Sequence, residues 1–425
     1  MERSSKIYQT YIQILKRELI PAAGCTEPIA IAYCAAVARS VLGCIPNRIH
    51  VQASGNIIKN VKSVIVPNTG GLRGIEAAAA IGVLAGDEHA QLEVLSHVSD
   101  EDRSRLPEFL QTAEITVSEA RSEHVLDITV DVMLGEEKVR VRSVEEHTNI
   151  VLIEKNGQVL LQKKADTQAD KELPDYDLLN VEQIYEFAET CHLEDVESIL
   201  KCQISYNEAI SNEGLQKNYG ANIGKTILTT YDAEDVRVRA RARAAAGSDA
   251  RMGGCELPVV INSGSGNQGL TASLPVIEYA KHLNSPREKL YRALLVSNLV
   301  TLHEKSGIGR LSAYCGAISA GAGAGAGIAY LNGGNYDAIA HTIVNTLAIA
   351  SGVVCDGAKP SCAAKIAVAV DAGILGYEMY RNGQQFLAGE GLVLKGVENT
   401  IRNISRLGRV GMKETDHEII QMMIE

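Results

Sequence analysis

The chain has 425 residues, too many for one ordinary hydrophobic core, and its hydrophobic content of 46% suits a packed globular protein of two domains. Its formal net charge of −11 and the lack of a basic tract argue against nucleic-acid binding. Segment 1–19 is charged throughout, and the longest apolar stretches are short and rich in glycine. We therefore expect a cytoplasmic protein with neither a signal peptide nor a membrane partner.

The chain begins with residues 1–46, which predict two helices joined by a turn at Cys25. In residues 47–166 several segments alternate polar with apolar side chains, as strands do. Asn156-Gly157 is a strong hairpin signal among them. We predict an inserted mixed α/β domain over 47–166, with β-rich segments at 48–55, 61–67, 113–120, 124–134, 138–146 and 149–164 and with helices at 74–86 and 101–113.

The rest of the chain, residues 167–425, is helical in nearly every long segment. The predicted fold is α+β: residues 1–46 and 167–425 form a helical domain, and the mixed domain is inserted between them. Aromatic residues are scarce, with no Trp and three Phe, whereas alanine and glycine are abundant. Such small-residue helices predict close helix contacts, either within one chain or between the copies of a homo-oligomer.

Three of the nine cysteines, Cys315, Cys355 and Cys362, lie in the helical half. An odd number of cysteines in a reducing compartment does not predict a disulfide framework. Their spacing lacks the paired Cys-x2-Cys ligands of a zinc ribbon, but iron–sulfur clusters accept widely spaced thiolates. Three thiolates on a four-iron cluster would leave one iron open to act as a Lewis acid. The alternative is that all three are core cysteines on small-residue helices.

Cys25 follows the turn Pro21–Gly24 and precedes Thr26, which we predict to be the N-cap of the next helix. A thiol at the positive end of a helix dipole is expected to favour the thiolate. We therefore expect Cys25 to be an exposed, reactive thiolate. The alternative is a buried thiol at a turn.

A glycine-rich turn follows a short apolar run and precedes a helix. Such a turn presents free N–H groups to an anion, and here side-chain amides are added that suit a small carboxylate and its amine. The alternative is an ordinary capped loop. The turn consists of Ser263, Gly264, Ser265, Gly266, Asn267 and Gln268.

These motifs together resemble the L-cysteine desulfidase family, which is related to the α chain of bacterial iron–sulfur L-serine dehydratases. The resemblance covers nearly the whole chain and rests on "PAAGCTEPIAIA", "SGNIIKNVKSVIVPNTGGLRGIEAAAAIG", "EEHTNI", "SGSGNQG" and the cysteine triplet. It implies a [4Fe-4S] cluster held by Cys315, Cys355 and Cys362. It also implies a lyase that works without pyridoxal phosphate and converts L-cysteine into pyruvate, ammonia and hydrogen sulfide.

Within this resemblance Cys25 is expected to be the catalytic base or a displaceable fourth ligand of the cluster. The turn 263–268 is expected to bind the carboxylate of a small amino-acid substrate. One alternative is an L-serine dehydratase that uses the same cluster, and a second is a non-catalytic cluster-binding or sensing protein. His147, His303 and the loop Asn68–Gly71 carry polar groups to which we assign no role.

Overall fold

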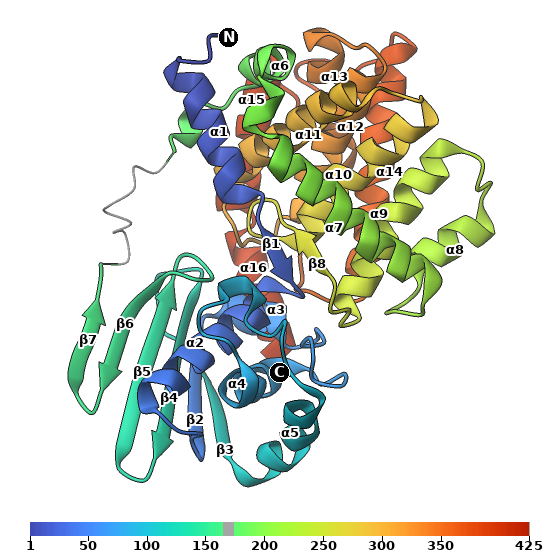
Figure 1. Ribbon diagram of the computed structural model, residues 1–425. Coiled ribbons are helices and arrows are strands. Elements are labelled where there is room, and N and C mark those ends of the chain that lie inside the picture. The colour runs from blue at the N-terminus through green and yellow to red at the C-terminus, as the bar shows by residue number, and fades with distance from the viewer. Residues whose placement is uncertain (165–173, 425) are drawn as a thin grey trace.

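The computed structural model describes residues 1–164 and 174–424 and has the predicted α+β fold. Figure 1 shows two lobes: a sheet lobe, residues 26–164, and a helical lobe, which holds the other described residues. In the described part of the chain no helix is both long enough and apolar enough to cross a membrane.

The sheet lobe is built on a six-stranded sheet in the order β3-β2-β4-β5-β6-β7, in which only β2 and β3 pair in parallel. Inward-facing valines and isoleucines of β2, β4 and β5 are buried, as strand alternation predicts. Asn156 and Gly157 form the β6–β7 hairpin with positive φ angles of 53° and 82°, which confirms the predicted turn. The strands are β2 (Arg48–Ala53), β3 (Glu114–Glu119), β4 (Asp127–Leu134), β5 (Glu137–Val144), β6 (Ile150–Lys155) and β7 (Gln158–Gln162).

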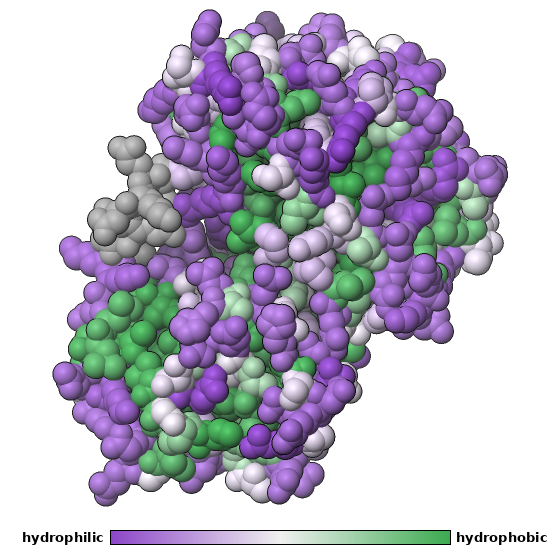
Figure 2. All heavy atoms as spheres, viewed as in Figure 1, coloured by the Kyte–Doolittle hydropathy of each residue, from purple (hydrophilic) through white to green (hydrophobic). Residues whose placement is uncertain are grey.

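Helix α2 (Thr26–Leu42) packs between β4, β5 and α4 (Gly74–Ala85), and α5 (Asp100–Thr112) packs on α4. The α2–α4 contact is close because a Cβ added at Gly82 would lie 2.4 Å from the carbonyl oxygen of Ala32. The apolar face of α2 therefore completes the core of the sheet lobe. Figure 2 shows apolar surface on this lobe, where the edge strand β7 exposes Val159 and Leu160.

The predicted strand at 61–67 is wrong. Helix α3 (Gly55–Val61) occupies its start, and a loop follows that has only an isolated bridge between Ile65 and Arg73. The run of β-branched residues packs into the core without pairing along its length, since Val64 and Val66 are buried from this loop. The loop carries α3 toward the helical lobe.

Helices of the helical lobe pack on one another through small residues. A Cβ added at Gly321 or Gly325 of α12 would lie 2.4 Å or 2.6 Å from a backbone oxygen of α14. The glycines of α12 therefore allow the close helix contacts that the small-residue composition predicts. The elements are α1 (Lys6–Glu18), β1 (Pro21–Ala23), α6 (Val181–Thr190), α7 (Glu197–Gln216), α8 (Ile223–Thr230), α9 (Val236–Met252), β8 (Pro258–Val260), α10 (Gly266–His282), α11 (Arg287–Ile308), α12 (Gly316–Leu331), α13 (Tyr336–Ala350), α14 (Cys362–Arg381), α15 (Val397–Arg406), a π-helical turn (Leu407–Gly411) and α16 (Lys413–Ile424), with 3-10 turns at Tyr176–Leu178 and Leu193–Asp195. A further 3-10 turn, Gln91–Glu93, belongs to the sheet lobe.

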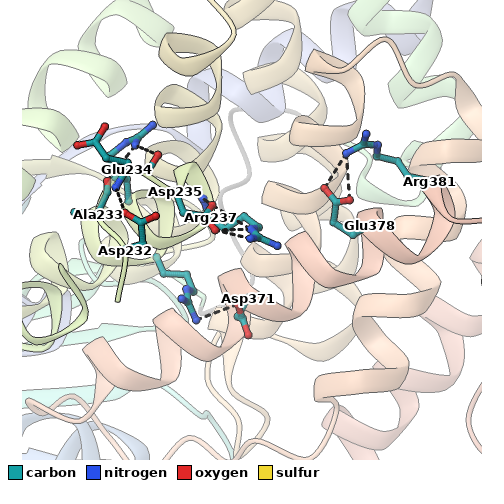
Figure 3. A network of polar contacts seen from close by, with 10 residues as sticks. Asp232, Ala233, Glu234, Asp235, Arg237, Asp371, Glu378 and Arg381 are labelled. Atoms are coloured by element: carbon teal, nitrogen blue, oxygen red, sulfur yellow. Dashed lines mark hydrogen bonds and ion pairs between the residues drawn. The ribbon is translucent and has the colours of Figure 1, made fainter. Parts of the chain in front are cut away.

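One ion pair joins α9 to α14 on the surface of the helical lobe, and another lies within α14. Arg241 contacts Asp371 at 3.1 Å, and Arg381 contacts Glu378 on the same helix at 3.1 Å, as Figure 3 shows. Asp371 and Arg381 are more than half exposed, so these pairs add little to stability.

Several contacts join the lobes, among them the hydrogen bond that Thr26 Oγ1 donates to the Gly264 oxygen. The short antiparallel pair β1–β8 leads directly into α2, and α16 packs on α3 of the sheet lobe. The sequence predicts that residues 1–46 belong to the helical domain, whereas α2, which lies within this range, packs on the sheet. The division at 46/47 stays a prediction, and the division at 166/167 lies outside the described residues.

Candidate active site

A cavity of about 100 Å³ lies where the two lobes meet. Segments far apart in the chain line it: the start of α2, α3, the β5–β6 turn, the turn before α10, and the loops before α12 and α14. All four predicted cysteines and most of the glycine-rich turn face the same space. These lining residues are Cys25, Cys315, Cys355, Cys362, Ser263, Gly264, Ser265, Asn267 and Gln268. Gly266 is the first residue of α10 and lies within this turn.

The three helical-lobe cysteines are brought together by loop pairing and by helix starts. The backbone N–H of Cys315 donates to Val353 at 3.2 Å, and that of Cys355 donates to Ala313 at 2.6 Å. Cys315 caps α12 and Cys362 begins α14. Burial is the larger cause that raises the pKa of Cys315 to about 12, and the neighbouring Cys355 is the second. The same two causes raise the pKa of Cys362.

This donor set suits a cluster better than a single ion. Among residues 1–164 and 174–424, no group of three His, Cys, Asp or Glu side chains is arranged around one metal ion. The thiolates of an iron–sulfur cubane bind different irons, so they need not converge on one point. Burial and the neighbouring thiols raise the pKa of Cys315 and Cys362, and a bound cationic metal would stabilise both as thiolates. The residues present therefore fit a cluster, and the roles of the individual cysteines stay predictions.

Cys25 is not the exposed thiolate that the sequence predicts. Its side chain is fully buried, its thiol lies 3.9 Å from Met252 Sδ, and Cys362 packs against the same small cluster. Cys25, not Thr26, is the N-cap of α2. Burial raises the pKa of Cys25 to about 12 and outweighs the opposing charge of Arg251. The helix terminus is too weak a field to overcome this desolvation.

The glycine-rich turn is held as a tight bridge between Asn262 and Ser265, with positive φ at Ser263 and Gly264. Two of its buried acceptors, Asn267 Oδ1 and Gln268 Oε1, have no hydrogen-bond partner within the described residues. Thr26 Oγ1 donates to the Gly264 oxygen at 3.0 Å, which ties the turn to the start of α2. The side-chain amides expected from the sequence thus present free acceptor oxygens at the cavity.

Other cavity residues were not assigned from the sequence. Lys305 is 4% exposed, its Nζ makes no hydrogen bond or ion pair with any described residue, and burial lowers its pKa to about 8. His147 also lines the cavity, and its buried Nε2 has no partner in the described part of the chain. Lys305 lies two residues after His303, whose side chain pairs with Glu398 at 2.7 Å.

Helix α3 brings two further side chains. Asn60 Nδ2 donates to Glu27 Oε1 at 3.0 Å, and Lys59 Nζ lies 2.5 Å from Asp416 Oδ1 of α16. Asn68 belongs to the polar loop Asn68–Gly71. Its Nδ2 donates to the Leu95 oxygen at 2.7 Å, and the residue is absent from the cavity lining. No motif in the sequence indicated that Lys59 and Asp416 would meet.

Comparison with known proteins connects this cavity to a family. The family model described as the serine dehydratase alpha chain matches residues 89–421. The UPF0597 protein DSY1109 of Desulfitobacterium hafniense (strain Y51) is 59% identical over 424 residues, with 100% of this chain and 98% of the relative covered. UPF0597 proteins of Lachnoclostridium phytofermentans and Treponema denticola are 51% and 45% identical, and each alignment covers 98% of this chain and at least 98% of the relative.

The matched range includes Cys315, Cys355, Cys362 and the turn before α10, and the full-length relatives extend the similarity over Cys25. The resemblance to iron–sulfur serine dehydratases is thereby confirmed at the level of the family. With the UPF0597 proteins, the chain belongs to the serine dehydratase alpha chain family of lyases.

Proposed function

We propose that this protein is an iron–sulfur-dependent lyase that eliminates sulfide from L-cysteine to give pyruvate and ammonia. The observation that carries the proposal is that Cys25, the three helical-lobe cysteines and the glycine-rich turn line one cavity of about 100 Å³. The cavity combines buried apolar groups with a few convergent polar ones, as sites for small molecules do. Arg310 adds positive charge for the substrate carboxylate.

When bound by Cys315, Cys355 and Cys362, a [4Fe-4S] cluster would supply a Lewis-acidic iron for the leaving group. The turn 263–268 and its neighbours hold the substrate carboxylate and ammonium, so that the Cα–H bond faces the base. The base takes the proton from Cα, and the electron pair of the broken Cα–H bond forms the Cα–Cβ double bond. The Cβ–S bond breaks, and its electron pair leaves with the sulfide. The resulting 2-aminoacrylate becomes the imine, and water hydrolyses it to pyruvate and ammonia.

Two side chains are candidates for the base. Cys25 must first lose its thiol proton to act as a base. Burial opposes this loss, because it raises the pKa of the thiol to about 12. Lys305 has a pKa of about 8, so a useful fraction of it is neutral near pH 7. We therefore propose Lys305 as the base and keep for Cys25 the role of a displaceable fourth ligand.

The second candidate function is an L-serine dehydratase with the same groups. The family match favours it, since the family model is described as the serine dehydratase alpha chain. A buried thiol-lined cavity favours cysteine, because a soft thiolate suits a cluster iron better than a hydroxyl does.

The test is an anaerobic assay of protein reconstituted with iron and sulfide, in which L-cysteine and L-serine are supplied separately. Pyruvate and sulfide are both measured. Equal amounts of the two from cysteine, formed faster than pyruvate from serine, would support the desulfidase. Faster pyruvate release from serine would move the assignment to the dehydratase, and turnover of neither by protein that retains its cluster would overturn both.

A further inference from the structure

Arg310 lies on the rim of the cavity, in the loop that joins α11 to α12. Its Nη2 donates to Glu18 Oε1 at 3.0 Å and lies 3.6 Å from Glu146 Oε1. Glu18 is 4% exposed and also accepts a hydrogen bond from the Tyr176 hydroxyl. One edge of the guanidinium is therefore fixed by buried carboxylate contacts.

The other edge of the guanidinium faces the glycine-rich turn. A Cβ added at Gly264 would lie 2.9 Å from Arg310 Nη1 and 3.6 Å from Cε1 of His147. Within the described residues Nη1 makes no hydrogen bond. The missing side chain at Gly264 thus lets an unused pair of N–H donors approach the turn, where a carboxylate can accept from a planar guanidinium.

Acceptors on the turn complement these donors. Asn267 Oδ1 and Gln268 Oε1 are buried, line the cavity and have no partner in the described part of the chain. An ammonium group donates to such oxygens, whereas a carboxylate cannot. The cavity therefore has a donor side at Arg310 and an acceptor side on the turn, as the two ends of an α-amino acid require.

Another guanidinium, that of Arg251, lies at the helix end of the same turn, where a Cβ added at Gly266 would lie 2.3 Å from its Nε. Its Nε donates to the Gly24 oxygen at 3.0 Å, which holds the turn before Cys25. Its charge acts to lower the pKa of Cys25 and Cys362. Arg251 thus acts on the thiols, and Arg310 is left for the substrate.

We infer that Arg310 binds the α-carboxylate of the substrate, with Glu18 as the positioning residue that holds its guanidinium. This deepens the proposed function and rests on it for the identity of the substrate. It predicts that the site rejects amino-acid analogues whose carboxylate is replaced by a neutral amide, because Nη1 would then lose its charged partner.

The test measures binding, not turnover, on protein reconstituted anaerobically. The probes are L-2-aminobutyrate, which resembles L-cysteine but has no leaving group, and its amide. Wild type is expected to bind the acid at least about 30-fold more tightly than the amide, which corresponds to about 2 kcal/mol for removing one partner of a buried charge pair. Arg310→Gln is expected to bring this ratio below about threefold, and Arg310→Lys is expected to give an intermediate ratio.

Glu18→Gln is the second variant, since it keeps the guanidinium and is expected to lower the ratio less than Arg310→Gln does. Arg409→Gln, an exposed arginine of the nearby π-helical turn, is the matched control and should bind as wild type does. A ratio in Arg310→Gln equal to that of wild type, or a wild type that binds acid and amide alike, overturns the inference. Pyruvate formation from L-cysteine is followed separately, so loss of the proposed function would be seen as absent turnover with the binding ratio intact.

Discussion

Cys25 and Lys305 face the same cavity, yet burial shifts their pKa values in opposite directions. Desolvation disfavours the charged form of each group, so it raises the pKa of the thiol to about 12 and lowers that of the ammonium to about 8. Near neutral pH the protein alone therefore holds a neutral thiol beside a partly neutral amine. This difference is the reason to assign the base to Lys305.

If Lys305 is the base, activity depends on its neutral form. The rate is expected to rise with pH through about 8 and then to level off, because the ammonium form cannot accept a proton. Lys305→Arg keeps the positive charge at every accessible pH, so kcat should fall at least about 100-fold. Lys289→Arg, at a partly exposed position of the same helix, is the control. A small loss with an unchanged pH profile would return the role of base to Cys25.

Gly264 gives a second prediction at this scale. Gly264→Ala places a methyl group 2.9 Å from Arg310 Nη1 at a φ of +77°, so the turn or the guanidinium must move. Gly333→Ala has a similar φ of +82° with nothing within 4 Å, and it therefore matches the backbone strain alone. Each variant should lose roughly 1 kcal/mol of unfolding free energy in a denaturant titration. Only Gly264→Ala should raise KM for L-cysteine, and equal KM values in the two variants would contradict the close contact.

At the scale of elements, α16 returns from the helical lobe to fix α3. Asp416 accepts from both Lys59 and Asn56 of α3, at 2.5 Å and 2.8 Å. Lys59 is 2% exposed and lines the cavity, so its ammonium depends on this carboxylate. A buried charge that loses its only close partner is strongly destabilising.

Asp416→Asn removes that partner with little change in shape. We expect a loss of about 3 kcal/mol in the docking of α16. Amide hydrogen exchange should become faster in α3 and α16 and stay unchanged in the sheet. Glu418→Gln, exposed on α16, is the matched control. Exchange in Asp416→Asn that equals that of the control would mean that the ion pair does not hold the two helices together.

Much of the element order could be predicted from local pattern, because alternating side chains indicate strands and Asn156-Gly157 demands a hairpin. The same reasoning failed at 61–67, where β-branched residues belong to a helix end and a buried loop. Short apolar runs do not distinguish these structures. The burial of Cys25 also escaped prediction, since capping rules describe a helix end without the lobe that covers it.

At the scale of the whole molecule, the cavity exists only where the two lobes meet. The cysteines and the glycine-rich turn could be identified from the sequence because each is a compact motif with recognisable chemistry. Arg310, Lys305 and Lys59 could not, because their function depends on which elements approach them: α1 for Arg310, the cysteine loops for Lys305 and α16 for Lys59. The site is therefore a property of the tertiary arrangement.

The central claim is that Cys315, Cys355 and Cys362 hold the group on which turnover depends. The most direct measurement is iron content together with pyruvate formation from L-cysteine, in anaerobically reconstituted wild type, Cys355→Ala and the control Cys44→Ala, whose exposed cysteine is absent from the cavity lining. We predict that wild type and Cys44→Ala bind the same amount of iron and form pyruvate, whereas Cys355→Ala loses both. Full iron content and undiminished pyruvate formation in Cys355→Ala would contradict the claim.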